Sequence, residues 1–208
     1  MKVIGLGLQC SVPDGILYAG LREKSYPFDW LWCPSKTTYH ILHRLIHQGI
    51  DSAIEYMTTG YTYYEYKQNE HYESVDGVTE CQMNKETGLG NTHFTINEEY
   101  KTTLRRRLER LLHVIHTEPI LFIYADAASP TTNYHLDNVE YGVDATEYLL
   151  KIYDLLSPLN PDIHIIYFCW TERKKENILE YVPYDHQPHF SYVSEIIKHH
   201  LIQWKATH

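Results

Sequence analysis

The sequence predicts one α/β domain over residues 1–208, with a mostly parallel or mixed sheet flanked by helices on both faces in a Rossmann-like order. Three apolar runs, Lys2–Gly7, Ile120–Ala125 and Ile163–Trp170, have the length and composition of buried strands. Segments with helical periodicity separate them, and such alternation is typical of a sheet covered on both faces. A chain of 208 residues can bury one sizeable core but is short for two.

The first strand is predicted to lead through a tight turn into a helix. Gly5 and Gly7 close the apolar run, and Pro13 suits a first helical turn, where its missing N–H is harmless. A second helix is expected from its cap Ser35 to a stop at Gly49. A third, short helix is expected directly afterwards, near residue 51.

The middle of the chain is tyrosine-rich and irregular. Residues 61–91 are polar and interrupted by glycine turns, which favours strands or long loops and little helix. The clearest helix follows over Asn97–His116, because Asn97 is a good N-cap and leucines recur at helical spacing. Asp144, with Glu147 three residues later, predicts the start of another helix, and a last one is expected around Val193–Trp204.

Composition excludes several classes of function. The formal net charge is −9, so the molecule repels a phosphate backbone and nucleic acid is not an expected partner. No apolar run approaches the roughly 20 residues of a membrane span, and the first residues lack an export signal, so a cytoplasmic location is expected. The four cysteines form no Cys-x-x-Cys pair, and no metal or other cofactor is expected.

Cys10 is the candidate nucleophile, because it lies where the first strand hands over to the first helix. A thiol at a helix N-terminus feels the positive end of the helix dipole, which favours the reactive thiolate. Gly7 and Gln9 belong to the same turn and are candidates for substrate binding, since backbone N–H groups there could stabilise an oxyanion. The alternative is that Cys10 is a small buried hydrophobic residue under a glycine turn.

A cysteine nucleophile needs a base and a group that orients the base. His93 follows the glycine turn at residues 88–90 and precedes a capped helix, a loop position from which a side chain can point inward. Asp126 comes directly after the strand Ile120–Ala125 and is the candidate third member. The alternatives are a solvated loop histidine and an aspartate that only shapes a turn.

Three further residues are candidates for substrate binding. Asp29 and Trp30 end a Ser-Tyr-Pro-Phe-Asp-Trp block, whose proline and aromatics around one carboxylate predict a rigid turn docked on the core. A partly buried Asp29 needs hydrogen-bond partners, whether its role is structural or functional. Arg107 flanks the apolar stripe of its helix while Arg106 points away, so Arg107 can hold Asp29 or clamp a ligand carboxylate or phosphate.

Several short segments occur together in this chain: Gly5-Leu6-Gly7-Leu8-Gln9-Cys10, Leu21-Arg22, Ser25-Tyr26-Pro27-Phe28-Asp29-Trp30, His93-Phe94 and Arg106-Arg107-Leu108. Over about residues 1–125 the sequence resembles a family of proposed papain-like cysteine peptidases of otherwise unknown function, found in bacteria and large DNA viruses. The resemblance implies that Cys10 is the nucleophile and His93 its histidine. It also implies a peptide or small-molecule substrate and, for a viral member, the host cytoplasm.

The sequence departs from the family pattern at two places. The family usually reads Ser-Leu-Gly before its cysteine turn, where this chain has Gly5-Leu6-Gly7, and Asp-Phe after its histidine, where Phe94 follows directly. The predicted strand before Cys10 also differs from papain, whose nucleophile helix is not preceded by such a strand.

This difference leaves two other classes of function open. One is a nucleotide-sugar-dependent glycosyltransferase or related glycan-assembly enzyme, which would bind its donor at the glycine turn and use Cys10 only structurally. The other is a non-catalytic binding module that offers its tyrosine-rich middle as a contact surface. The sequence specifies neither the substrate nor the oligomeric state.

Overall fold

The computed structural model describes residues 1–7, 11–66, 79–84, 86–91, 95–126, 145–169, 179–183 and 189–207. Its centre is a sheet of four parallel strands, β1 (Lys2–Gly5), β5 (Ile120–Ala125), β6 (Ile163–Cys169) and β7 (Leu179–Pro183), in the order β1-β5-β6-β7. The chain is therefore a mixed α/β protein, and the predicted parallel sheet is confirmed.

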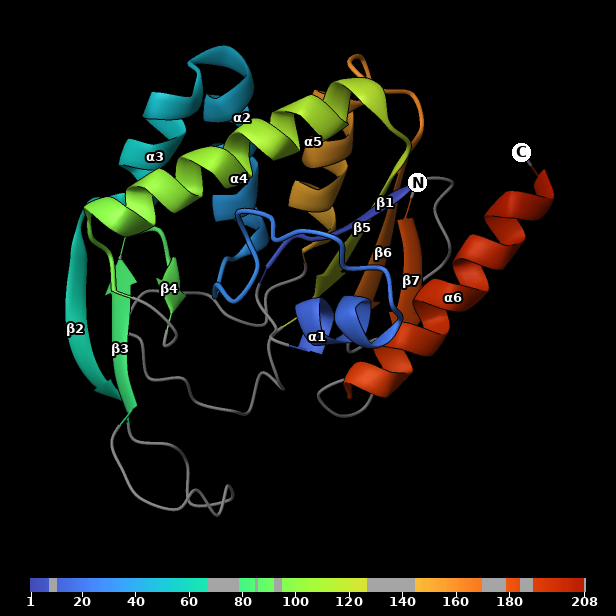
Figure 1. Cartoon of the computed structure of the whole chain (residues 1–208), viewed down its shortest axis with the longest axis horizontal. Coiled ribbons are helices and arrows are strands. Elements are labelled where there is room, and N and C mark those ends of the chain that lie inside the picture. Colours follow the sequence, from blue (N-terminus) through green and yellow to red (C-terminus); the bar gives the residue numbers. More distant parts are fainter. Residues whose placement is uncertain are drawn as a thin grey trace.

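Helices cover both faces of this sheet (Figure 1). On one face lie α1 (Ser11–Tyr18) and α6 (Phe190–Thr207). On the other face lie α2 (Ser35–His47), α4 (Glu98–Thr117) and α5 (Thr146–Leu156), with α3 (Ile50–Thr58) packed beside them. Side chains alternate between the two faces along each strand, so Val3 packs with the α1 and α6 side while Ile4 packs with the other.

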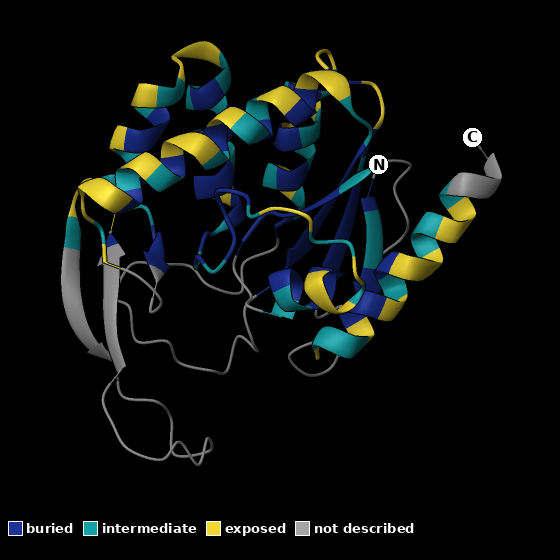
Figure 2. Cartoon of the chain, viewed as in Figure 1, coloured by how far each residue is buried: buried dark blue, intermediate teal, exposed yellow. Residues whose placement is uncertain are grey.

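Burial follows the same division, because each helix turns one apolar stripe to the sheet (Figure 2). In α4 the buried residues recur at helical spacing: Tyr100, Leu104, Leu108, Leu111, Val114 and Ile115. β5 is buried at every position, as expected for an inner strand of a parallel sheet. Among the described helices, none combines the length and the apolar character that a membrane crossing requires.

A small antiparallel sheet accounts for the described part of the tyrosine-rich middle. It consists of β2 (Tyr61–Tyr66), β3 (Thr79–Asn84) and β4 (Gly90–Asn91), so the expectation of strands rather than helix is confirmed there. Its β4 is joined to the rest of the protein by Trp32, whose N–H and carbonyl oxygen bond Gly90 at 2.8 and 2.9 Å.

The predicted helix starts are partly right. The Asn97 side chain accepts a hydrogen bond from the Tyr100 N–H at 2.8 Å, which confirms it as the cap of α4. Ser35 is not a cap: it is the first residue of α2, after Pro34, and its N–H donates to a tyrosine hydroxyl instead. The cap of α5 is Ala145, one residue later than predicted from Asp144, which lies outside the described residues.

Candidate functional site at the carboxyl edge of the sheet

The residues predicted to form the site fall into two groups. Cys10, Gln9 and His93 lie outside the described residues. The other candidates, Gly7, Asp29, Trp30, Arg107 and Asp126, are described, and so are the segments that lead to the first group.

Asp126 follows β5 at the carboxyl edge of the sheet and is almost fully buried, at 5% exposed. Its N–H continues the ladder to the Phe168 carbonyl oxygen at 3.1 Å. Its Oδ2 accepts a hydrogen bond of 2.6 Å from the Tyr167 hydroxyl, which itself accepts from the Ala145 N–H at 3.1 Å. The carboxylate is thus held by a short chain of hydrogen bonds that links β5, β6 and the start of α5.

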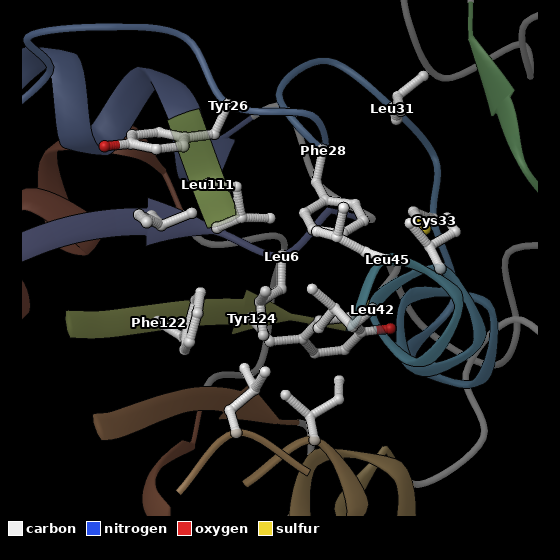
Figure 3. Packing of buried hydrophobic residues seen from close by; sticks show 14 of the residues in the cluster. Leu6, Tyr26, Phe28, Leu31, Cys33, Leu42, Leu45, Leu111, Phe122 and Tyr124 are labelled. Atoms are coloured by element: carbon white, nitrogen blue, oxygen red, sulfur yellow. The ribbon is translucent and has the colours of Figure 1, made fainter. Parts of the chain in front are cut away.

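The two tyrosines near Asp126 remain neutral hydrogen-bonding groups. Burial raises the pKa of Tyr167, and the charge of Asp126 together with the hydrogen bond to it raises this pKa further. Tyr124 is buried and its pKa is also raised, first by burial and then by Asp126. Figure 3 shows the Tyr124 ring extending from β5 toward α2, where its hydroxyl accepts the Ser35 N–H at 3.1 Å.

The turn after β1 is packed tightly against Cys33. Gly7 has a φ of +103°, and a methyl group on it would lie 2.7 Å from Cys33 Cβ. Thr38 secures the same place, because its hydroxyl donates to the Leu6 carbonyl oxygen at 3.0 Å and lies 3.1 Å from Cys33 Sγ. Gly7 therefore has a structural reason to be glycine, beyond any contact with substrate.

Cys33 is a structural cysteine. It is fully buried, and burial raises the pKa of its thiol to about 12, with Thr38 lowering it slightly. A thiol with this pKa stays protonated near neutral pH and is a poor nucleophile. Cys169 is also buried, so the thiols of Cys33 and Cys169 are both shielded from solvent.

Asp29 is buried beside β1, at 4% exposed. Its Oδ2 accepts from the Tyr26 N–H at 3.0 Å and from Arg22 Nη2 at 3.2 Å, and its Oδ1 lies 3.8 Å from where a Gly5 methyl group would be. Burial raises the pKa of Asp29, while the Tyr26 N–H, Arg22 and Arg107 oppose that rise. The ion pair that neutralises Asp29 is thus made by Arg22.

Arg22 is a residue of this candidate site that helical or strand periodicity cannot identify. It precedes Asp29 by seven residues and meets it only because the chain folds back between them. Its guanidinium carbon also lies 5.5 Å from the centre of the Trp30 ring, and Trp30 has a φ of 67°. The sequence does contain one indication of its role, because an arginine and a carboxylate that is expected to be buried occur in the same short segment.

Arg107 lies on the inward side of α4, as predicted, and Arg106 is exposed and bonds Thr103 at 3.0 Å. Burial lowers the pKa of Arg107, and the nearby Tyr100 and Asp29 raise it. Its Nη1 is buried without a hydrogen-bond partner. Arg107 therefore influences Asp29 through its charge, whereas Arg22 makes the direct contact.

The described residues contain no cluster of three or more metal-ligating side chains. His43 and His47 lie one turn apart on α2, with ring centres separated by 4.5 Å and ring planes tilted by 57°. No third ligand lies beside them in the described part of the chain, and the two histidines form part of the helix surface.

A family profile covers most of the chain. The family described as "putative papain-like cysteine peptidase (DUF1796)" matches residues 1–140. The chain belongs to this family. Comparisons with curated proteins and with solved structures gave no significant match.

The segment matched by the family holds the predicted site residues. The matched segment runs from β1 through β5 and includes Cys10, Asp29, His93, Arg107 and Asp126. Tyr167, which holds Asp126, comes from β6 beyond the matched segment. The papain-like family member described here has a strand of the central sheet before α1, as its sequence predicts.

Proposed function

We propose that this papain-like family member is a cysteine-nucleophile hydrolase that cleaves peptide bonds. Cys10 is the nucleophile, His93 the general base, and Asp126 the carboxylate that orients the histidine. Gly7 and Gln9 form the turn around the nucleophile, and the family match supports the assignment of chemistry.

The proposal rests on the connections that leave β1 and β5: the helices that follow these two neighbouring strands pack on opposite faces of the sheet. These strands are adjacent and parallel, yet α1, which follows β1, packs on one face of the sheet, and α5, which follows β5, packs on the other. In open α/β sheets, ligands bind beyond the carboxyl ends of strands where the connections part in this way. In the sequence, Cys10 comes shortly after β1 and Asp126 directly after β5, which are the two strands where the connections part.

The described anchors of Cys10 and His93 are side by side. Gly7 packs on Cys33, and the neighbouring Trp32 pairs with Gly90. Cys10 lies three positions after Gly7 and His93 three positions after Gly90, so each segment spans at most about 10 Å. These spans are compatible with a contact between the thiol and the imidazole, as the proposal requires.

Helix dipoles favour the thiolate at this edge of the sheet. The α2 N-terminus is anchored there through Ser35 and Tyr124, the α5 N-terminus is anchored there through Tyr167, and α1 begins directly after Cys10. Each positive helix end stabilises negative charge, most strongly within its first turn. Unpaired N–H groups at the start of α1 are suited to binding the oxyanion of a tetrahedral intermediate.

In the proposed reaction, the Cys10 sulfur attacks the scissile carbonyl carbon after His93 has taken the thiol proton. The tetrahedral intermediate collapses with cleavage of the C–N bond, and His93 returns the proton to the departing amine. Water, deprotonated by His93, then attacks the thioester, releasing the carboxylic acid and restoring the thiol. Asp126 stays ionised and holds the imidazole in one orientation.

Thiol labelling tests the proposal directly. Iodoacetamide at neutral pH, followed by peptide mapping, is expected to modify Cys10 first, with Cys33 and Cys169 as internal buried controls. The variant Cys10→Ser should lose this rapid phase. Labelling of Cys10 that is no faster than labelling of Cys33, or that requires denaturant, would overturn the proposed nucleophile.

A further inference from the structure

Two arginines act on one buried carboxylate beside β1, and a third arginine bonds the same loop. Arg22 pairs with Asp29, and Arg110 donates to the carbonyl oxygen of Ser25 in the same segment. Arg107 lies close enough for its charge to interact with Asp29, Arg22 and Arg110. The two guanidinium groups of Arg22 and Arg107 therefore face the single carboxylate of Asp29, so positive charge exceeds negative charge at this carboxylate.

Among these arginines, Arg107 has a guanidinium nitrogen that lacks a hydrogen-bond partner. Its Nη1 is buried without a partner, and no carboxylate in the described part of the chain lies within ion-pair distance of it. An arginine stays charged in proteins, and a buried charged donor without an acceptor is costly. An anion bound to this guanidinium would accept its hydrogen bonds, which would remove the free-energy cost of the unpaired donor and balance the excess positive charge.

We propose that Arg107 and Arg22 form an oxyanion-binding site that takes a carboxylate or phosphate group. Both chemistries match the fork of a guanidinium, which can donate two parallel hydrogen bonds to two oxygens. Asp29 holds Arg22 in place, and the Trp30 ring supports the same guanidinium. Neither arginine residue is fully buried, but Nη1 of Arg107 is itself covered, so an anion that binds it must displace the side chains that cover it.

The site is adjacent to the turn that leads to Cys10. A methyl group on Gly5 would lie 3.8 Å from Asp29 Oδ1 and 3.0 Å from Val12 Cγ1, so Asp29 and the first turn of α1 flank the same residue. Val12 follows Cys10 by two residues. The site therefore binds an acidic group of the substrate near the nucleophile, an assignment that rests on the proposed function.

Anion binding is measured on the full-length Cys10→Ala variant, which separates binding from catalysis. Inorganic phosphate and succinate are titrated at constant ionic strength, with chloride as the reference, and the midpoint of thermal unfolding is followed. At ten times the Kd, a specific ligand should raise the Tm by about 3–6 °C. A rise with phosphate alone or with succinate alone identifies which oxyanion the site prefers.

The matched pair of variants is Arg107→Gln and Arg106→Gln, introduced into the same background. Each removes one positive charge from α4, but Arg106 is exposed and lies on the outer side of the helix. The shift should persist in Arg106→Gln and disappear in Arg107→Gln. Arg107→Lys, which keeps the charge but loses the fork, should weaken binding about tenfold and serves if the glutamine variant does not fold.

The site is refuted if neither anion raises the Tm, or if Arg107→Gln responds as strongly as Arg106→Gln. If the anion binds but Cys10 is unreactive in the labelling experiment, the binding site stands and its assignment to a hydrolase substrate falls. If Cys10 is reactive and no anion binds, the proposed hydrolase stands without this site.

Discussion

The contact between the β1–α1 turn and Cys33 can be tested by replacing Gly7 with alanine. Two penalties should add in Gly7→Ala. The backbone has a φ of +103°, which an L-residue adopts at a cost of about 1–2 kcal/mol. The new methyl group would also lie 2.7 Å from Cys33 Cβ and 3.3 Å from its carbonyl oxygen.

Neither neighbouring atom can move away cheaply, since Cβ and the carbonyl oxygen are fixed to the backbone. Overpacking of this kind costs about 1–3 kcal/mol. The free energy of unfolding should therefore fall by roughly 2–5 kcal/mol in Gly7→Ala.

Gly20→Ala is the matched control for backbone strain. Gly20 has a φ of +75°, and a methyl group on it would have no neighbour within 4 Å, so this variant should lose only about 1–2 kcal/mol. Urea unfolding of both variants, with the m-value checked for constancy, measures the difference. If Gly7→Ala is no less stable than Gly20→Ala, the turn does not press on Cys33 as the structure indicates.

Two further predictions concern buried polar groups. Because folding raises the pKa of Cys33 from 9.0 to about 12, the unfolded chain loses this proton first as pH rises. The contribution of Cys33 to stability should be constant below about pH 9 and then fall by about 1.4 kcal/mol per pH unit between these values. The variant Cys33→Ala should lack that part of the slope in pH-dependent urea unfolding. Tyr167→Phe removes the donor to Asp126 and the acceptor for the Ala145 N–H, so it should lose about 2–4 kcal/mol, whereas Tyr192→Phe, at an exposed ring, should change stability by less than about 0.5 kcal/mol. Equal urea midpoints for the two phenylalanine variants would contradict the hydrogen-bond chain at Asp126.

The elements that could be predicted from sequence are those whose local pattern agrees with their burial. β5 matches the predicted run Ile120–Ala125 because every position is buried, and α4 follows from leucines that recur at helical spacing after Asn97. β7 (Leu179–Pro183) was not predicted. It is a short edge strand with only two buried residues and a proline at its end, so it carries no continuous apolar signal.

Residues that depend on long-range contacts were harder to predict. Asp126 could be placed at the carboxyl end of β5 from sequence, but its partner Tyr167 is 41 residues away. Serine is favoured at helix caps, which predicts a cap at Ser35. In the structure the Ser35 N–H instead donates a hydrogen bond to the hydroxyl of Tyr124, 89 residues away. In both cases a tyrosine hydroxyl supplies a partner that local propensity cannot reveal.

The Ser-Tyr-Pro-Phe-Asp-Trp block has a structural role that connects these features. β1 is at one end of the strand order, where an open edge would otherwise offer unpaired backbone groups. Phe28 packs with Ile4 on the α2 and α4 side, Asp29 lies beside Gly5 near α1, and Cys33 contacts Gly7. The segment from Phe28 to Cys33, three of whose side chains are labelled in Figure 3, therefore has contacts on both sides of β1. Because this segment contacts Gly5 and Gly7, it constrains where the turn toward Cys10 begins, and its Asp29, beside Gly5, holds Arg22 by an ion pair.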